Sequence, residues 1–226
     1  MLALVGSGEY LPPIESLDRE LIGRLPGPVR VVCLATAAGT EGADRIAYWS
    51  NLGVEHFTRL GVSAAAVPVT DRTSANDPAL AAAIASANFV YLSGGKPDYL
   101  YQALVGSLAW EAIRSVLASG GLLAGCSAGA MILGEKFFGF PGWKPGFNFL
   151  PGATILPHFD EIPQAMIRSL RALTGKDIIL LGIEGNTALV GSGGQFEVLG
   201  SGGVTVWTRA GKTRYTRGPL PYWGKI

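Results

Sequence analysis

The stretch GLLAGCSAGA, residues 121–130, decides how this chain folds, because it joins a short apolar run to the pattern G-x-S-x-G. Residues 121–125 predict a buried strand, and helical periodicity resumes from Ser127 onward. Between a strand and a helix, this pattern is typical of a sharp turn that lifts the central side chain clear of the sheet. The helix N-terminus then presents N–H groups where an oxyanion would form. We therefore expect Ser127 to be a nucleophile; the alternative is a tight turn whose small residues serve only packing.

Strand and helix patterns alternate through the first two-thirds of the chain. Strands are expected at residues 2–6, 29–37, 62–69 and 89–92, and helices at residues 41–60, 77–86, 97–105 and 108–119. Residues 29–37 are apolar on both faces, as strands of a covered parallel sheet are. Repeated strand–helix–strand units predict an α/β fold, a doubly wound and mostly parallel sheet flanked by helices, with right-handed crossovers.

The pattern changes past residue 139. Residues 140–152 are rich in Pro and Gly and predict a loop. After the loop we expect a strand at 153–156, a helix at 162–173 and a strand at 178–183. Gly-rich turns separate short strands from residue 187 to 207, which indicates an antiparallel edge near the C-terminus. No linker separates two cores, so we expect one domain over residues 1–226.

The composition excludes several classes of protein. Hydrophobic residues make up 48% of the 226 residues and charged residues 15%, so the chain has enough apolar surface to fold and is not intrinsically disordered. A net charge of +1 gives no general attraction for nucleic acid or an anionic membrane. No apolar run is long enough to span a bilayer, and no secretory signal is visible. The two cysteines, Cys33 and Cys126, lie in apolar runs, and we expect a cytoplasmic protein.

A serine hydroxyl needs a base to take its proton, and the chain has two histidines. His158 follows the strand expected at 153–156, and strand ends are where ligands bind in open α/β sheets. His56 lies inside a helical pattern and is expected to be structural. We therefore predict that His158 is the general base. Cys126 stands one position too early for the nucleophile of the turn, and we expect a small buried side chain there.

A third group should hold the imidazole in place, and that group should be a carboxylate. Glu184 follows the strand expected at 178–183 and is the favoured candidate. The competing carboxylates are Asp160, Glu161 and Glu135. Asp160 would need an unusual turn to reach the ring of His158. We expect hydroxyl, imidazole and carboxylate to meet above the carboxyl edge of a single sheet.

A glycine pair, Gly94 and Gly95, follows the strand expected at 89–92. Without a Cβ in the way, a backbone N–H there can approach a substrate oxygen. With the N–H of Ala128, that of Gly95 would complete an oxyanion hole; the alternative is an ordinary strand-to-helix turn. Residues 6–9 lack the third glycine of a phosphate loop, and no residue set has metal-ligand spacing. We therefore expect no cofactor and no metal.

Together these segments resemble the serine peptidase family that includes aspartyl dipeptidase (dipeptidase E) and cyanophycinase. The segments that carry the resemblance are residues 6–9, 93–95, 125–130, 157–159 and 182–186, in the family's order. The resemblance implies a fold like that of class I glutamine amidotransferases and a Ser-His-Glu triad. The residues that match the triad and the oxyanion hole are Ser127, His158 and Glu184, and Gly95 and Ala128, respectively.

The resemblance implies hydrolysis of a small peptide, most simply a dipeptide with N-terminal aspartate. An aspartyl side chain needs a cation, and Arg168 and Arg171 lie one helical turn apart after the predicted base. They are candidates for substrate binding, with ordinary surface charge as the alternative. Glu9 and Gly94 are further candidates, Glu9 for a substrate ammonium group. Lys96 follows the glycine pair, where the family usually has Asn or Thr.

Three other functions remain open from the sequence. They are a cyanophycinase-like hydrolase of β-linked Asp-Arg, a non-catalytic binding protein on the same scaffold, and a thiol-dependent amidase that uses Cys126. The modest length of the chain favours the dipeptidase. The aromatic residues near the C-terminus indicate a homodimer or buried packing: Trp207, Tyr215, Tyr222 and Trp223.

Overall fold

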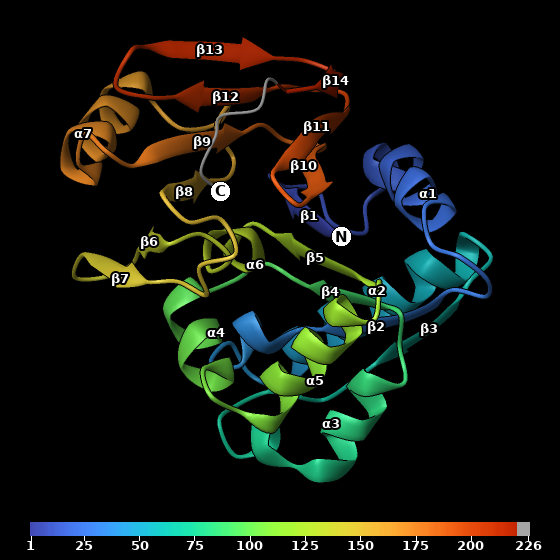
Figure 1. The fold of residues 1–226 in the computed structure, drawn as a ribbon. Coiled ribbons are helices and arrows are strands. Elements are labelled where there is room, and N and C mark those ends of the chain that lie inside the picture. The colour runs from blue at the N-terminus through green and yellow to red at the C-terminus, as the bar shows by residue number, and fades with distance from the viewer. Residues whose placement is uncertain (221–226) are drawn as a thin grey trace.

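The computed structural model describes residues 1–220, which form a large central sheet with a smaller sheet beside it (Figure 1). The strands of the large sheet are β1 (Leu2–Val5), β2 (Arg30–Leu34), β3 (Ser63–Ala66), β4 (Phe89–Leu92), β5 (Leu122–Cys126), β10 (Thr187–Ser192), β11 (Gln195–Gly200) and β14 (Gly218–Pro219). Their order is β14-β11-β10-β1-β5-β4-β2-β3. Strands β1, β5, β4, β2 and β3 pair in parallel, and β10, β11 and β14 extend the sheet in antiparallel fashion. The predicted α/β class, with a mostly parallel sheet and antiparallel strands near the C-terminus, is confirmed.

Helices cover both faces of the large sheet (Figure 1). They are α1 (Glu15–Gly23), α2 (Ala43–Arg59), α3 (Pro78–Ala85), α4 (Pro97–Leu104), α5 (Leu108–Ala118) and α6 (Ala128–Met131), whereas α7 (Gln164–Thr174) lies elsewhere. Short 3-10 turns span Pro12–Ile14, Thr36–Ala38 and Ser74–Asn76. Side chains of β1 alternate between two cores: Leu2 and Leu4 pack with residues of α3, α4 and α5, and Ala3 and Val5 with residues of α1 and α2. This alternation follows from the two-residue period of a strand that is covered on both faces.

A second sheet of four strands, in the order β13-β12-β9-β8, lies next to the large one. Its strands are β8 (Ala153–Leu156), β9 (Ile179–Ile183), β12 (Val204–Trp207) and β13 (Lys212–Tyr215). Helix α7 covers it, with Ile167 packed against Leu180 and Phe159 in a small core of their own. The remaining two strands of the described residues, β6 (Lys136–Phe138) and β7 (Trp143–Pro145), form an antiparallel hairpin. The residues that follow β8 therefore leave the second sheet, and not the edge of the large sheet.

Several element predictions hold closely and three need correction. Strand β4 has the predicted bounds, and Asp77 caps α3 by accepting the N–H groups of Ala79 and Leu80 at 2.7 and 3.2 Å. Helix α1 was not predicted, although Leu17 and Leu21 are buried one turn apart. The segment predicted as a loop contains β7, and the strands at 153–156 and 179–183 belong to the second sheet, not to the large one.

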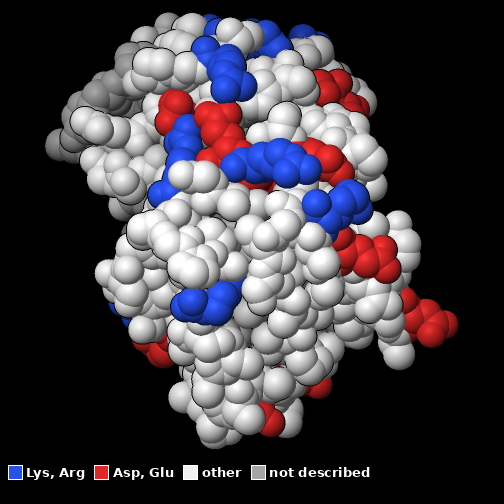
Figure 2. All heavy atoms as spheres, turned by 90° about the vertical axis from the view of Figure 1, so that its right-hand side faces the viewer, with Lys and Arg blue, Asp and Glu red and all other residues white. Residues whose placement is uncertain are grey.

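Acidic and basic side chains alternate on the face that carries α1. Arg24 bridges Glu20 and Glu197 at 3.0 and 2.7 Å, and Arg217 pairs with Glu20 at 2.9 Å. Figure 2 shows this face with the two signs side by side across its upper half. The charges there offset one another instead of building a field of one sign. In the described part of the chain, no helix combines the length and the apolar character that crossing a bilayer requires.

Buried polar side chains connect α1 and α2 with the loop that follows β4. His56 Nε2 lies 2.7 Å from Asp18 Oδ2, and both side chains are fully buried. Burial raises the pKa of the Asp18 carboxyl, and the hydrogen bond to His56 opposes that rise. The Tyr10 ring packs 5.9 Å from the His56 ring, and its hydroxyl lies 2.8 Å from Ser93 Oγ. His56 is a structural residue here, as its place in the helical pattern indicates.

Replacing His56→Ala should lower the free energy of unfolding by about 3 kcal/mol, because it leaves the buried Asp18 carboxyl without a partner. Urea unfolding followed by circular dichroism measures the change. The control is Arg114→Ala, which breaks an exposed pair with Glu111 and should cost less than about 0.5 kcal/mol. A loss below about 1 kcal/mol for the His56 variant would contradict a structural role for the buried pair.

Candidate active site

Ser127 stands at a sharp turn between β5 and α6. Its backbone has φ 51° and ψ −112°, a conformation that non-glycine residues rarely adopt. The turn is held by three hydrogen bonds: the Ser127 N–H donates to Val5 O at 3.0 Å, and the N–H groups of Ala130 and Met131 donate to Ser127 O at 3.0 Å. Backbone strain of this kind persists only where the surrounding structure fixes it. The predicted strand–turn–helix setting of Ser127 is present.

The glycines on either side of Ser127 are required by close backbone contacts. A Cβ at Gly125 would lie 2.4 Å from the backbone carbonyl of Gly129, and one at Gly129 would lie 2.5 Å from Leu92 O. Both contacts are with backbone atoms, which cannot move aside as a flexible side chain can. The two glycines of the G-x-S-x-G pattern are therefore required because β5, α6 and β4 pack too closely for a Cβ at either position.

His158 reaches Ser127 from the second sheet. It follows β8, and its Nε2 lies 3.1 Å from Ser127 Oγ. Its backbone also has a positive φ of 52°, and Phe159 N–H donates to Ile183 O at 3.1 Å just beyond it. The structure thus brings together the two side chains predicted as nucleophile and base, although they come from two sheets and not from the edge of one.

The carboxylate next to His158 is Glu161, one of the competing candidates. His158 Nδ1 lies 3.1 Å from Glu161 Oε2, and Ser7 Oγ lies 3.5 Å from Glu161 Oε1. The two residues are three apart in a short turn closed by the Glu161 N–H donating to His158 O at 2.9 Å. The Glu161 side chain is 61% exposed, so its charge is partly screened by water.

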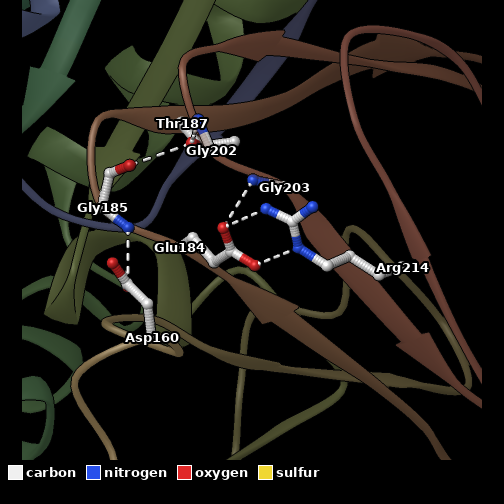
Figure 3. A network of polar contacts seen from close by, with 7 residues as sticks. All are labelled: Asp160, Glu184, Gly185, Thr187, Gly202, Gly203 and Arg214. Atoms are coloured by element: carbon white, nitrogen blue, oxygen red, sulfur yellow. Dashed lines mark hydrogen bonds and ion pairs between the residues drawn. The ribbon is translucent and has the colours of Figure 1, made fainter.

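The expected contact between Glu184 and His158 is absent from the described residues, and this prediction needs correction. The Glu184 carboxylate is bound by Arg214, with Nε at 2.5 Å and Nη2 at 2.6 Å, and by the Gly203 N–H at 2.9 Å. Figure 3 shows the carboxylate turned toward the guanidinium on β13. The hydrogen bonds from Arg214 lower the pKa of Glu184 below its ordinary value. The side chain follows β9 as predicted, but the strands beside β9 supply a stronger partner than the imidazole.

The remaining competitors satisfy backbone groups elsewhere. Asp160 Oδ1 accepts the Gly185 N–H at 2.9 Å, as Figure 3 shows. Glu135 Oε2 accepts the Gly152 N–H at 2.7 Å. Each of these two carboxylates holds a loop in place.

Several backbone N–H groups near Ser127 have no hydrogen-bond partner among the described residues. They include those of Gly95 and Ala128, the pair predicted for the oxyanion hole. Gly94 lies against Ser127, since a Cβ there would be 3.1 Å from Ser127 Cβ and 3.6 Å from Ser127 Oγ. The glycine pair thus lies beside Ser127, and one of its two backbone donors, the Gly95 N–H, is unpaired in the described residues.

Glu9, Arg168 and Arg171, which were predicted to bind substrate, are either bound to other groups of the protein or exposed on α7. Glu9 is 8% exposed and accepts the Gly94 N–H at 2.9 Å, so it is not free to meet a substrate ammonium group. Arg171 binds Gly175 O and Ile178 O at 2.9 and 3.1 Å, and its guanidinium lies over the Trp207 ring. Arg168 is exposed on α7 and has no hydrogen bond or ion pair with any described residue. Nothing in these contacts places either arginine beside Ser127.

Cys126 is a buried thiol, as predicted. Its Sγ lies 3.0 Å from Glu9 Oε2, and burial raises the pKa of the thiol well above its ordinary value. A thiol that is neutral and shielded from solvent is a poor nucleophile. This environment counts against the thiol-dependent alternative. Across residues 1–220, no three His, Cys, Asp or Glu side chains gather in a way that could hold a metal ion.

Sequence reasoning placed Glu161 only among the alternatives and did not find Ser7 or Tyr10. For Glu161 a signal existed, because a residue three positions after a histidine reaches its ring when the chain makes a tight turn. The positive φ of His158 creates that turn, and it could not be read from the sequence. Ser7 and Tyr10 reach the site through tertiary contacts alone.

Known proteins share both the sequence pattern and the fold. A model of peptidase family S51 matches residues 2–199. The crystal structure of a peptidase from an acI-B1 actinobacterium is 35% identical, with a TM-score of 0.87, over 96% of this chain and 94% of that one. A Listeria monocytogenes EGD-e protein whose name places it with peptidase E is 20% identical, with a TM-score of 0.65, over 88% and 98% of the two chains, which shows likeness of fold. No curated protein matches the sequence.

The Glu184→Gln substitution should destabilise the protein by about 1 kcal/mol at pH 7, because it removes the bidentate pair with Arg214. A lowered carboxyl pKa stabilises the fold above the ordinary value of 4.5, and this stabilisation is lost as pH falls through the lowered pKa. Urea unfolding of the variant and the wild type should therefore differ at pH 7 and converge toward pH 3. Arg214→Gln should behave in the same way; a difference that persists unchanged at pH 3 would contradict the role of the ion pair.

Proposed function

Since this chain belongs to peptidase family S51, and is a serine-type peptidase, we propose that it hydrolyses dipeptides with an N-terminal aspartate through Ser127 and His158. The observation that carries the proposal is the 3.1 Å contact between Ser127 Oγ and His158 Nε2. Two residues 31 positions apart, each at a positive φ, converge there from different sheets. Such strained residues cluster where geometry serves a reaction.

The proposed reaction proceeds through an acyl-enzyme. His158 Nε2 takes the proton of Ser127 Oγ as that oxygen bonds to the scissile carbonyl carbon, and the carbonyl electrons move to oxygen. The tetrahedral intermediate collapses with cleavage of the C–N bond, and the imidazolium gives its proton to the leaving amine. Water then attacks the acyl-enzyme and passes a proton to His158. When the C–Oγ bond breaks, Ser127 recovers that proton and the carboxylic acid leaves.

The N–H groups of Gly95 and Ala128 stabilise the oxyanion in this proposal. Their lack of a partner among the described residues supports the assignment. Each donor aimed at the developing charge contributes about 3 kcal/mol to the transition state. Glu161 holds the Nδ1–H tautomer of His158, so that Nε2 presents its lone pair to the serine.

The substrate side chain requires a cation, and Lys96 meets this need better than the two predicted arginines. Lys96 directly follows Gly95, and its Nζ lies 2.8 Å from the Thr40 hydroxyl, with no carboxylate partner in the described structure. The Lys96 and Thr40 side chains line an open hollow of about 500 Å³ together with Tyr99, Phe140 and Asp98, and the Asp98 carboxylate is paired with Lys144. A substrate carboxylate placed there would find an ammonium group that forms no ion pair with an acidic side chain of the described residues.

A fluorophosphonate probe should label the wild-type protein and should fail to label the Ser127→Ala variant. The reason is that a serine activated by a base displaces fluoride from the probe and is phosphonylated. Mass spectrometry of the labelled peptide measures the outcome. An unlabelled but folded wild type would instead support the non-catalytic binding protein.

A panel of dipeptides then defines the specificity. Asp-Leu should be cleaved at least tenfold better in kcat/KM than Ala-Leu or β-linked Asp-Arg, and Lys96→Gln should erase the preference over Ala-Leu. Preference for β-linked Asp-Arg would favour the cyanophycinase-like alternative. Equal rates for Asp-Leu and Ala-Leu would refute the proposed specificity while leaving the peptidase intact.

The Glu161→Gln substitution should lower kcat about tenfold, less than the loss of a buried triad carboxylate, because the Glu161 charge is largely exposed. The defect should shrink at high ionic strength, which screens the same charge in the wild type. Glu184→Gln serves as the matched control and should leave kcat within twofold. If the control loses more kcat than the Glu161 variant, the assignment of the carboxylate is wrong.

We further propose a reducing, cytoplasmic environment, supported by the two buried free thiols Cys33 and Cys126. A small peptide is the proposed partner, and neither nucleic acid nor a membrane is proposed as one. A homodimer stays a prediction. Of the aromatic residues that indicated it, Trp207 has Lys212 Nζ 5.4 Å from its ring centre, which favours packing within the chain. Tyr222 and Trp223 lie outside the described residues.

A further inference from the structure

We infer that Glu9 is a positioning residue that sets the direction of the oxyanion-hole donor at Gly95, through its hydrogen bond with the preceding glycine. The inference rests on the proposed function, because it assumes that the Gly95 N–H meets the developing oxyanion. It replaces the expectation that Glu9 contacts substrate. Glu9 itself touches no reacting atom in this role.

The Glu9 carboxyl group bridges the two loops that form the site. Its Oε1 accepts the Gly94 N–H at 2.9 Å, in the loop after β4. Its Oε2 lies 3.0 Å from Cys126 Sγ, at the end of β5 and next to the nucleophile. Strands β4 and β5 are parallel neighbours in the large sheet, so one side chain ties their carboxyl ends together. The side chain is only 8% exposed, and its position is fixed by packing.

The backbone donors of the loop after β4 show what this tie achieves. The Ser93 N–H donates to Leu34 O at 3.1 Å, and the Lys96 N–H donates to Ala37 O at 3.0 Å. With the Gly94 N–H bound by Glu9, the protein uses three of four consecutive donors. Only the Gly95 N–H lacks a partner among the described residues. The hydrogen bonds of the neighbouring peptide groups therefore hold the peptide that carries the Gly95 N–H in one orientation.

The close packing of Gly94 makes the arrangement specific. A Cβ at Gly94 would lie 2.6 Å from Glu9 Oε1 and 3.1 Å from Ser127 Cβ. The loop thus fits between the carboxyl group and the serine with no spare room. A hydrogen bond at this point therefore fixes a distance to the nucleophile as well as an orientation, and errors of about 1 Å at such a site cost large factors in rate.

If Glu9 acts by the position of its acceptor atom and not by its charge, two conservative substitutions should separate the effects. Glu9→Gln keeps the length and an acceptor oxygen for the Gly94 N–H. Glu9→Asp keeps the charge but withdraws the carboxyl group by one methylene, so it cannot span both loops. The expected order of kcat is wild type, then Glu9→Gln within about tenfold, then Glu9→Asp lower by about 100-fold, as for loss of one oxyanion donor. KM should stay within about twofold throughout.

A second readout reports on the oxyanion itself. A peptide aldehyde forms a tetrahedral adduct with Ser127, whereas the corresponding alcohol binds without one. Glu9→Asp should weaken aldehyde inhibition by a factor similar to its loss of kcat and leave alcohol inhibition unchanged. Asp77→Ala is the control for general loss of stability, because it removes a carboxylate that accepts two backbone N–H groups at the remote start of α3. It should lower the melting temperature and leave kcat and the aldehyde affinity intact.

The outcomes distinguish this inference from the proposed function. Suppose that the fluorophosphonate labels the wild type and that kcat of Glu9→Asp equals or exceeds kcat of Glu9→Gln. This result overturns the inference and leaves the proposed function intact. A raised KM with unchanged kcat in both Glu9 variants also overturns it, because that result assigns Glu9 to substrate binding. Wild type that is folded, unlabelled and inactive toward every dipeptide overturns the proposed function and the inference together.

Discussion

The contact between Ser127 and His158 joins two sheets, and the rest of the structure is arranged to permit it. A hydrogen bond of 3.1 Å between side chains on separate sheets requires the sheets to dock with an error well below 1 Å. That docking depends on the backbone at the end of β1. A Cβ at Gly6 would lie 2.0 Å from Glu184 O, and one at Gly8 would lie 2.2 Å from Asn186 Oδ1. The first strand of the large sheet therefore ends directly against the turn that leaves β9.

This close approach explains the segment Gly6-Ser7-Gly8-Glu9 without a phosphate. Its glycines make room for the turn after β9, and the Gly6 N–H donates to Thr187 O at 2.9 Å. Ser7 and Glu9 then point to opposite parts of the site, Ser7 to the Glu161 carboxylate and Glu9 to the loop after β4. One short segment thus contacts both the proposed base and the proposed oxyanion hole. A change in its backbone would disturb both.

Sequence alone predicted the parts of the fold that local patterns determine. Alternating apolar strands and helices gave the large sheet, and the G-x-S-x-G pattern located Ser127 because glycine reports a steric limit that acts locally. Helix α1 was not predicted, although Leu17 and Leu21 have helical spacing. The second sheet was not predicted because strand pairing between distant segments leaves no local signal. Glu184 was assigned correctly to a strand end and incorrectly to His158, since nothing before residue 214 reveals its partner.

The partners and the solvent exposure of Glu161 and Glu184 explain why Glu161, and not Glu184, is hydrogen-bonded to His158. Glu184 is only 15% exposed and sits against a guanidinium that matches both of its oxygens, so leaving Arg214 for a neutral imidazole would break two charge-assisted bonds. Glu161 has no such competitor and stays in water, where its hydrogen bond with the imidazole costs little desolvation. An exposed carboxylate orients the ring but stabilises the imidazolium only weakly. In the proposed mechanism, most of the catalytic effect would then come from the oxyanion donors, whose positions depend on buried contacts on the other side of Ser127.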